Sequence, residues 1–310
     1  MNILVTGGAG YIGSILVPAL LNEGHKIIVI DNFMYNQTSL LDCCYDKNLK
    51  IINGDARNRD LIAEKIKKVD AIIPLACLVG APICAKMPIE AKSINYDAIK
   101  MILELKSKNQ KILFPNTNSG YGIGKINEYC TEKSSLNPVS LYGQLKVEIE
   151  KEILENGNAI TLRLATVFGI SPRMRLDLLV NDFVYRAVND RFIVLYESHF
   201  KRNFIHVRDV AHAFIHCINN FEKMKNETYN VGLSDANISK IELCNLIKKQ
   251  LPYFDIGESD FGKDPDKRNY IVSNEKIEAT GYKAKFSLNN GITELIKGFQ
   301  IIKRNQYSNI

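Results

Sequence analysis

The chain has 310 residues, of which 46% are hydrophobic and 24% are charged. These fractions are typical of a globular protein, and the length allows one large domain or two ordinary ones. The net charge of +6 is spread along the chain without a dense basic block. This distribution suits an anionic small substrate and argues against nucleic-acid binding.

The cysteines and the apolar runs exclude further classes of protein. Seven cysteines are present without a Cys-x-x-Cys pair, so we expect neither a disulfide framework nor a metal site. No apolar run is long enough to cross a membrane, and the first residues read directly as a strand. We therefore expect a cytoplasmic protein without a membrane partner.

Short apolar strands alternate with helical segments through the first half of the chain. The expected strands are 3–5, 27–30, 50–52, 71–75, 111–114 and 160–164, with helices near 14–22, 58–68, 90–107 and 140–155. This alternation predicts an α/β fold with a doubly wound parallel sheet and ligands at the strands' carboxyl ends. The rhythm weakens near residue 166. We expect a larger domain of residues 1–165 with about 203–232, and a smaller lobe of about 166–202 and 233–310.

A glycine-rich turn follows the first expected strand. It carries Gly7, Gly10 and Gly13, and a helical pattern begins directly after it. Glycines let the backbone approach a pyrophosphate, and the helix N-terminus favours its charge. Asp31 ends the second strand, about where a carboxylate binds an adenosine ribose. The segment predicts a dinucleotide site, against the alternatives of a turn that only packs a helix closely and an ordinary turn residue at Asp31.

Tyr142 and Lys146 lie at the start of a later expected helix, preceded by the helix-start signals Pro138 and Ser140. Being four residues apart, they share one helix face. An amphipathic surface helix is the usual explanation, but beside a nucleotide fold the two can form an acid/base pair. A phenol with a pKa of ~10 must shift by about three units, or ~4 kcal/mol, to act near neutrality. One cation at ~4 Å supplies about that much, and both Lys146 and an oxidised nicotinamide are candidates.

These motifs resemble those of the extended short-chain dehydrogenase/reductases, over essentially the whole chain and in the same order. The matching segments are Thr6-Gly7-Gly8-Ala9-Gly10-Tyr11-Ile12-Gly13, Asp31-Asn32, Gly54-Asp55, Thr117 and Tyr142-x-x-x-Lys146. The most similar branch contains the NAD-dependent nucleotide-sugar epimerases and dehydratases, such as UDP-galactose 4-epimerase. The resemblance implies a catalytic triad in which Thr117 orients a sugar hydroxyl, Tyr142 removes its proton and Lys146 assists.

The same resemblance implies NAD as the cofactor and names its contacts. Beside the three glycines, these are Tyr11, Ile12, Asp31, Asn32, Asp55, Ala56, Leu75, Ala76, Asn95, Tyr142 and Lys146. It also implies a UDP- or GDP-linked sugar as the partner.

Residues of the second lobe provide the expected substrate contacts. Arg202 resembles the family arginine that holds the substrate diphosphate, which a guanidinium can grip with two N–H groups. Its alternative is a solvated surface arginine. Arg268 is a second phosphate candidate, and Arg173 and Arg175 are candidates by charge. Asn118 and Thr166 complete the expected set, although Thr166 stands where the family usually has Asn.

Departures from the family narrow the expected reaction to oxidation at C4 of the sugar. Dehydratases carry Thr-Asp-Glu where this chain has Thr117-Asn118-Ser119, which lacks the acid and base needed to eliminate water. No cysteine replaces Asn118, which argues against the epimerase–reductases. The remaining reactions are release of the ketone by a dehydrogenase and re-reduction by an epimerase.

Three stretches are similar to the GDP-manno-heptose 4-dehydrogenases of surface-polysaccharide synthesis: 75–82, 116–122 and 229–235. This resemblance favours a 4-dehydrogenase over a 4-epimerase. A catalytically idle NAD(H)-binding regulator is an alternative from another class, and the intact triad argues against it. The resemblance also implies a homodimer, or a tetramer built from it, that pairs through the 90–107 helix and the Tyr142 helix. In segment 90–107 we expect a wide apolar surface of Ile94, Ala98, Ile99, Ile102, Leu103 and Leu105.

Overall fold

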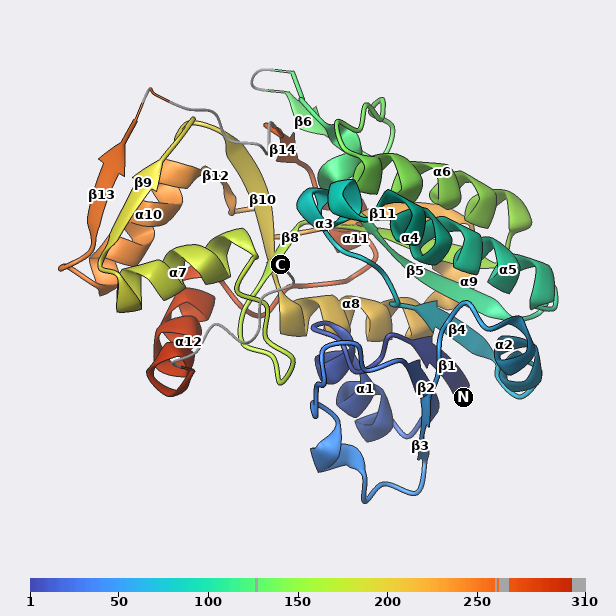
Figure 1. Cartoon of the computed structure of the whole chain (residues 1–310). Helices are drawn as coiled ribbons and strands as arrows, with labels where there is room; N and C mark the ends of the chain where they lie inside the picture. The colour runs from blue at the N-terminus through green and yellow to red at the C-terminus, as the bar shows by residue number, and fades with distance from the viewer. Residues whose placement is uncertain (126–127, 260, 262–267, 303–310) are drawn as a thin grey trace.

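A seven-stranded parallel sheet forms the centre of the larger part of the molecule (Figure 1). The computed structural model describes residues 1–125, 128–259, 261 and 268–302. Within these residues the strand order is β11-β7-β5-β4-β1-β2-β3. The bounds are β1 (Asn2–Thr6), β2 (Lys26–Asp31), β3 (Leu49–Asn53), β4 (Ala71–Pro74), β5 (Lys111–Thr117), β7 (Ala159–Leu164) and β11 (Glu227–Val231). The predicted doubly wound sheet is confirmed, and β11 adds a strand that the alternation did not predict.

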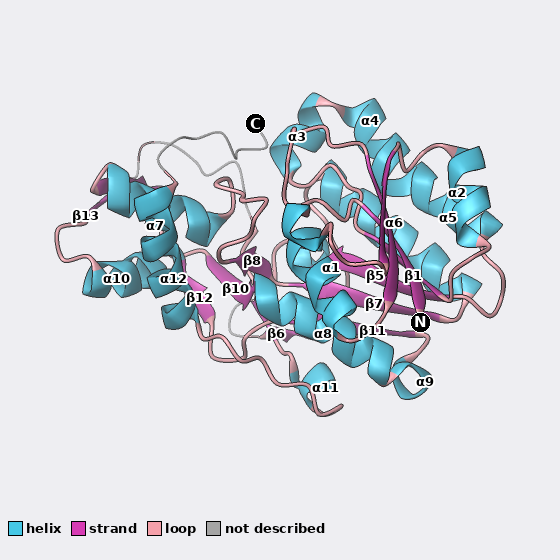
Figure 2. Cartoon of the chain, turned by 90° about the horizontal axis from the view of Figure 1, so that it is seen from below, coloured by secondary structure: helices cyan, strands magenta, loops and turns pink. Residues whose placement is uncertain are grey.

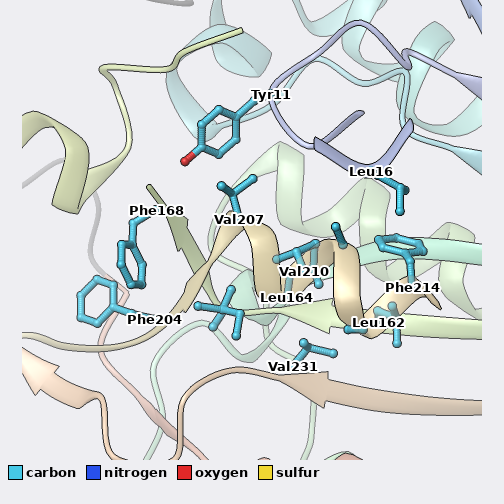
Figure 3. Close-up of a cluster of buried hydrophobic side chains, with 14 of the residues drawn as sticks. Tyr11, Leu16, Leu162, Leu164, Phe168, Phe204, Val207, Val210, Phe214 and Val231 are labelled. Carbon is cyan, nitrogen blue, oxygen red and sulfur yellow. The ribbon is translucent and has the colours of Figure 1, made fainter. Parts of the chain in front are cut away.

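Helices cover both faces of this sheet (Figure 2). On one face lie α1 (Gly13–Asn22) and α8 (Val207–Asn219), and on the other α2 (Arg59–Ile66), α5 (Ala98–Leu105) and α6 (Leu141–Asn156). Side chains alternate across a strand, so Ile3 and Val5 of β1 enter one core cluster while Leu4 enters the other. Figure 3 shows the first cluster around α8, with Tyr11 at its edge.

The expected helix near 90–107 forms over residues 88–105, with a π-helical turn inside it. The run consists of α4 (Pro88–Lys92), the π-helical turn η2 (Ser93–Asp97) and α5. Four of the six apolar residues expected to offer a free surface are buried in the described chain, namely Ala98, Ile99, Ile102 and Leu103. Their burial against the sheet explains the apolar pattern without a partner subunit.

Most of the remaining elements lie beside the large sheet, as both views show. They form small sheets of β8 (Thr166–Phe168), β10 (Lys201–His206) and β12 (Asn237–Ser239), of β9 (Phe192–Leu195) and β13 (Asp255–Glu258), and of β6 (Tyr129–Cys130) and β14 (Ile271–Val272). Their main helices are α7 (Leu179–Asn189), α10 (Lys240–Gln250) and α12 (Leu288–Ile301). The short elements are η1 (Leu41–Cys43), α3 (Ala81–Lys86), η3 (Asn118–Tyr121), α9 (Phe221–Met224) and α11 (Glu275–Glu278). Among the described residues, no helix is both long and apolar enough to span a membrane.

Candidate active site

A cavity of about 890 Å³ lies at the carboxyl ends of the sheet strands, where a doubly wound fold binds its ligands. Its wall joins segments that are far apart in the sequence. The residues predicted for function that line it are Gly7, Gly10, Tyr11, Ile12, Gly13, Leu75, Thr117, Tyr142, Lys146, Thr166, Arg173, Arg175, Arg202 and Arg268. The structure therefore places the three expected catalytic residues and the glycine turn in the wall of one cavity.

The glycine turn has the geometry of a phosphate seat. Gly7 adopts a φ of +69°, and a Cβ there would lie 2.5 Å from the backbone nitrogen of Ala76. Helix α1 begins with Ile12 as its N-cap, whose side chain makes no capping hydrogen bond, and the first turn has no acidic residue. The positive end of this helix thus faces the cavity without a competing carboxylate. These residues fit the pyrophosphate of NAD.

Tyr11 ties the glycine turn to the neighbouring lobe. Its hydroxyl donates to the carbonyl oxygen of Gly169 at 2.7 Å, and Ser171 Oγ donates to the Tyr11 carbonyl at 2.7 Å. Figure 3 shows the ring extending from the turn towards the segment that carries Phe168. The expected cofactor contact at Tyr11 therefore belongs to a residue that also fixes the loop leading to Arg173.

Asp31 lies behind the glycine turn rather than in the wall of the cavity. Its side chain is buried and, within the described chain, accepts hydrogen bonds from Ala9 N and Phe33 N at 2.9 Å and from Gln37 Nε2 at 3.2 Å. A carboxylate offers about four lone-pair sites. One acceptor site is left for a ribose hydroxyl, and the rest of the carboxylate shapes the turn.

Two of the other predicted residues outside the wall, Asn95 and Asp55, hold loops in place. Asn95, in the π-helical turn, accepts from Leu78 N and donates to Leu78 O, both at 2.9 Å. Asp55 is paired with Arg57, whose hydrogen bonds lower the pKa of that carboxyl. Ala76 packs against Gly7.

Three further predicted residues are also absent from the wall, namely Asn32, Ala56 and Asn118. Asn118 is buried, and its side-chain amide has no hydrogen-bond partner among the described residues.

The side chain of Lys146 reaches the backbone of β5. Its Nζ donates to Pro115 O at 2.9 Å and lies 4.3 Å from the centre of the Phe114 ring. Cys77, three residues beyond the end of β4, has an electrostatic contact with Lys146, and both residues line the cavity. Burial lowers the pKa of Lys146, and the nearby Cys77 opposes that shift. Cys77 was assigned no role from the sequence, although it follows the carboxyl end of an expected strand.

Burial and charge oppose each other at the phenol of Tyr142. Burial raises its pKa well above the usual value, and Cys77 raises it further. The cations that lower this pKa most are Arg175 and Arg268 rather than Lys146. Lys146, one of the two candidate cations, has its ammonium group hydrogen-bonded to Pro115 O and close to the Phe114 ring.

Thr117, at the end of β5, belongs to a hydrogen-bonded group that includes Ser119, which was considered from the sequence only as unable to act as an acid or base. Its Oγ1 donates to Ser119 Oγ at 2.9 Å, and Arg268 Nη1 also donates to Ser119 Oγ. The backbone N–H of Thr117 donates to Asn116 Oδ1 at 2.9 Å. Ser119 could have been found only from its place two residues beyond Thr117.

Several arginine side chains line the cavity. Arg173 lies over the Tyr35 ring at 4.3 Å, and Arg202 lies 5.7 Å from the centre of the Tyr270 ring. Arg175 is held by Asp177, with Nη2 and Oδ2 2.5 Å apart. The wall also contains Arg268, so four guanidinium groups converge on one cavity. Such a set can bind a diphosphate.

A model of the NAD dependent epimerase/dehydratase family matches residues 3–232. The chain belongs to this family. It is 27% identical to a putative UDP-glucose 4-epimerase of Methanocaldococcus jannaschii, and the match covers 95% of this chain and 97% of that one. The recognition of the family from the motifs is thus confirmed, and so is its assignment as an NAD-dependent enzyme.

Solved structures of this family share the whole fold. A dTDP-glucose 4,6-dehydratase from Bacillus anthracis, in complex with NAD, has a TM-score of 0.85 at 25% identity, with 98% and 97% of the two chains covered. A UDP-glucose 4-epimerase from Thermotoga maritima has a TM-score of 0.86 at 23% identity, with 98% and 100% covered. The match covers the full length of the Thermotoga maritima enzyme, so the two chains share the whole fold.

Proposed function

We propose that this enzyme oxidises a nucleotide-diphosphate sugar at C4 and releases the 4-keto sugar. The observation that carries the proposal is that the glycine turn, the side chains of Thr117, Tyr142 and Lys146, and four arginines line one cavity. We further propose that residues 1–165 and 203–232 hold the cofactor and that the smaller lobe holds the sugar nucleotide. The arginines supply the charge that a diphosphate requires.

In this proposal each side chain has a defined task. Tyr142 takes the proton of the C4 hydroxyl as the C4–H bond breaks, and Thr117 helps to hold that hydroxyl. NAD, which the glycine turn would hold, would supply the acceptor for the hydride that leaves C4. Lys146, held by Pro115 O, keeps a positive charge under the site, and the arginines orient the diphosphate. Oxidation leaves a C4 carbonyl, a reduced nicotinamide and a proton.

The sugar that we propose is GDP-manno-heptose, because segments 75–82, 116–122 and 229–235 are similar to the 4-dehydrogenases that use it. A 4-epimerase of UDP-sugars is the second candidate, and the epimerases among the relatives favour it. Elimination of water is not proposed, because Asn118 and Ser119 provide neither the acid nor the base.

The test uses the purified protein loaded with NAD and a panel of GDP-manno-heptose, GDP-mannose and UDP-glucose. We expect GDP-manno-heptose to give the largest rise in reduced-nicotinamide absorbance, and mass spectrometry to detect a product two hydrogens lighter. A faster reaction with UDP-glucose would overturn the choice of sugar. Binding of NAD with no reaction in the panel, in parallel with retained fold, would favour the idle regulator.

A further inference from the structure

The hydroxyl group of Ser119, in the wall of the active-site cavity, accepts hydrogen bonds and donates none among the described residues. Ser119 is in η3 and is one of the side chains that line the cavity. Within the described residues its Oγ accepts two hydrogen bonds, from Thr117 Oγ1 at 2.9 Å and from Arg268 Nη1. A serine hydroxyl has two acceptor lone pairs and one proton. Both lone pairs are occupied, so the proton is the part that can reach a ligand.

The hydroxyl of Thr117 is in the opposite state. Its proton is directed to Ser119 Oγ, and its oxygen accepts from the backbone N–H of Ser119 at 3.1 Å. Thr117 therefore has one acceptor site left and no proton to give to a sugar oxygen in this arrangement. Of the two hydroxyls, Ser119 is the donor.

The position of Ser119 relative to the catalytic helix agrees with this role. A Cβ placed on Gly143, the residue after Tyr142, would lie 3.4 Å from the Ser119 carbonyl oxygen, so η3 packs directly on the start of α6. Arg268, which donates to Ser119, also acts electrostatically on the Tyr142 phenol. A hydrogen bond from a hydroxyl that is polarised by a guanidinium is stronger than one from an isolated hydroxyl.

We propose that Ser119 is a further catalytic residue, whose hydroxyl donates a hydrogen bond to a sugar oxygen at or beside C4. Arg268 is its positioning residue, because it fixes the oxygen of Ser119 and leaves the proton free. This proposal rests on the proposed function, since it needs a sugar in the cavity. Thr117 then acts by orienting Ser119 as well as by accepting from the sugar.

The kinetic test compares Ser119→Ala, Ser119→Thr and Thr117→Val in full-length protein loaded with NAD, using the member of the sugar panel that reacts fastest. Loss of a charge-assisted hydrogen bond predicts a fall in kcat/KM of about 10- to 100-fold in Ser119→Ala. Ser119→Thr keeps the hydroxyl and should recover much of this loss. Ser234→Ala is the matched control, because Ser234 bonds to Glu278 on the surface and should leave the rate unchanged. Wild-type activity in Ser119→Ala, with a loss in Thr117→Val, would overturn the proposal.

A binding test separates a contact with the sugar from a change in loop structure. Dissociation constants for GDP and GDP-mannose are measured with wild type and Ser119→Ala. The affinity for GDP should not change, whereas the gain from adding the sugar should shrink in the variant. Equal weakening of both ligands would mean that Ser119 only supports the loop, which overturns the proposal. A wild type that binds GDP-mannose but oxidises no panel sugar would count against the proposed function, and the binding comparison would still decide the role of Ser119.

Discussion

At the residue scale, the phenol of Tyr142 sets the pH dependence of the reaction. Burial raises its pKa, and the charges of Arg175 and Arg268 oppose this without cancelling it. Only the deprotonated phenol accepts the proton, so its fraction grows about tenfold per pH unit below the pKa. We predict that the single-turnover rate of cofactor reduction rises with pH across the neutral and alkaline range. Stopped-flow measurements at saturating sugar would show this slope, and a rate that falls with pH would contradict it.

Tyr142→Phe is the control for this assignment. It removes one oxygen from a ring that still packs in the same place, so NAD should bind with little change. The rate should fall roughly a hundredfold or more, and the pH dependence should disappear with it. A variant that kept most of its activity would show that another group is the base.

Asp31 predicts a preference for NAD over NADP. Its buried carboxylate, held by Ala9, Phe33 and Gln37, has one acceptor site left and would repel a 2′-phosphate. We expect Kd for NADP to exceed that for NAD by at least about tenfold in titrations of the apoprotein. Tighter binding of NADP would refute this prediction, and Asp31→Asn should narrow the difference.

The sequence predicted which side chains line the cavity better than it predicted the hydrogen bonds that these side chains make. Spacing alone gave the face shared by Tyr142 and Lys146, and the family resemblance added Thr117. The sequence could not show that Lys146 bonds to Pro115, since that contact depends on the packing of α6 against β5. The hydrogen bonding of Ser119 was missed for a similar reason, because the hydrogen bond from Arg268 joins residues 149 positions apart.

At the element scale, a buried ion pair fastens α6 to the sheet beneath the catalytic residues. Glu150 and Arg163 are 2.6 Å apart, and their side chains are 4% and 7% exposed. Glu150 also accepts from Asn116, whose Oδ1 holds the backbone of Thr117. We predict that Arg163→Met, which leaves Glu150 buried and unpaired, lowers the free energy of unfolding by about 3–5 kcal/mol. Urea unfolding of the two proteins measures this difference.

The exposed pair Lys151–Glu155 on the same helix is the matched control. Its atoms are 3.9 Å apart, and the side chains are 79% and 64% exposed. Lys151→Met should change the free energy of unfolding by less than about 1 kcal/mol, because solvent screens such pairs. Equal effects of the two substitutions would show that the buried pair does not fasten α6.

The hydrophobic pattern correctly predicted whether a segment forms a strand or a helix wherever the segment's own sequence decides its structure. The six expected strands all form, because each contains a short apolar run that pairs in the parallel sheet. Most of them are buried on both faces, whereas β3 lies at the sheet edge and is partly exposed. The break at η2 was not predictable, since Asn95 turns inward to both polar groups of Leu78, a contact across the fold. The strand β11 was missed because it returns to the sheet from the far part of the chain.

At the scale of the whole molecule, we predict a homodimer or a tetramer built from it. The support is the family resemblance, because most of the apolar surface once expected of segment 90–107 is buried within the subunit. Ile89 of α4 remains 80% exposed beside this segment. Light scattering at micromolar concentration should give at least twice the 35.0 kDa chain mass. A monomer under these conditions would contradict the prediction.

The fate of the ketone distinguishes a dehydrogenase from an epimerase, which need the same three catalytic side chains. An epimerase must enclose its reduced cofactor and ketone until the ring is reduced again. A dehydrogenase releases the ketone and stops until its cofactor is oxidised by another substrate. The two therefore differ in whether reduced cofactor accumulates.

The most direct test mixes the NAD-loaded enzyme with GDP-manno-heptose and follows the absorbance of reduced nicotinamide and the masses of the sugar products. We predict about one reduced cofactor per active site, a released 4-keto sugar, and a stall that ends when an external keto acid or fresh NAD is added. Continued conversion to the 4-epimer, with neither a stall nor a free ketone, would contradict the proposed dehydrogenase.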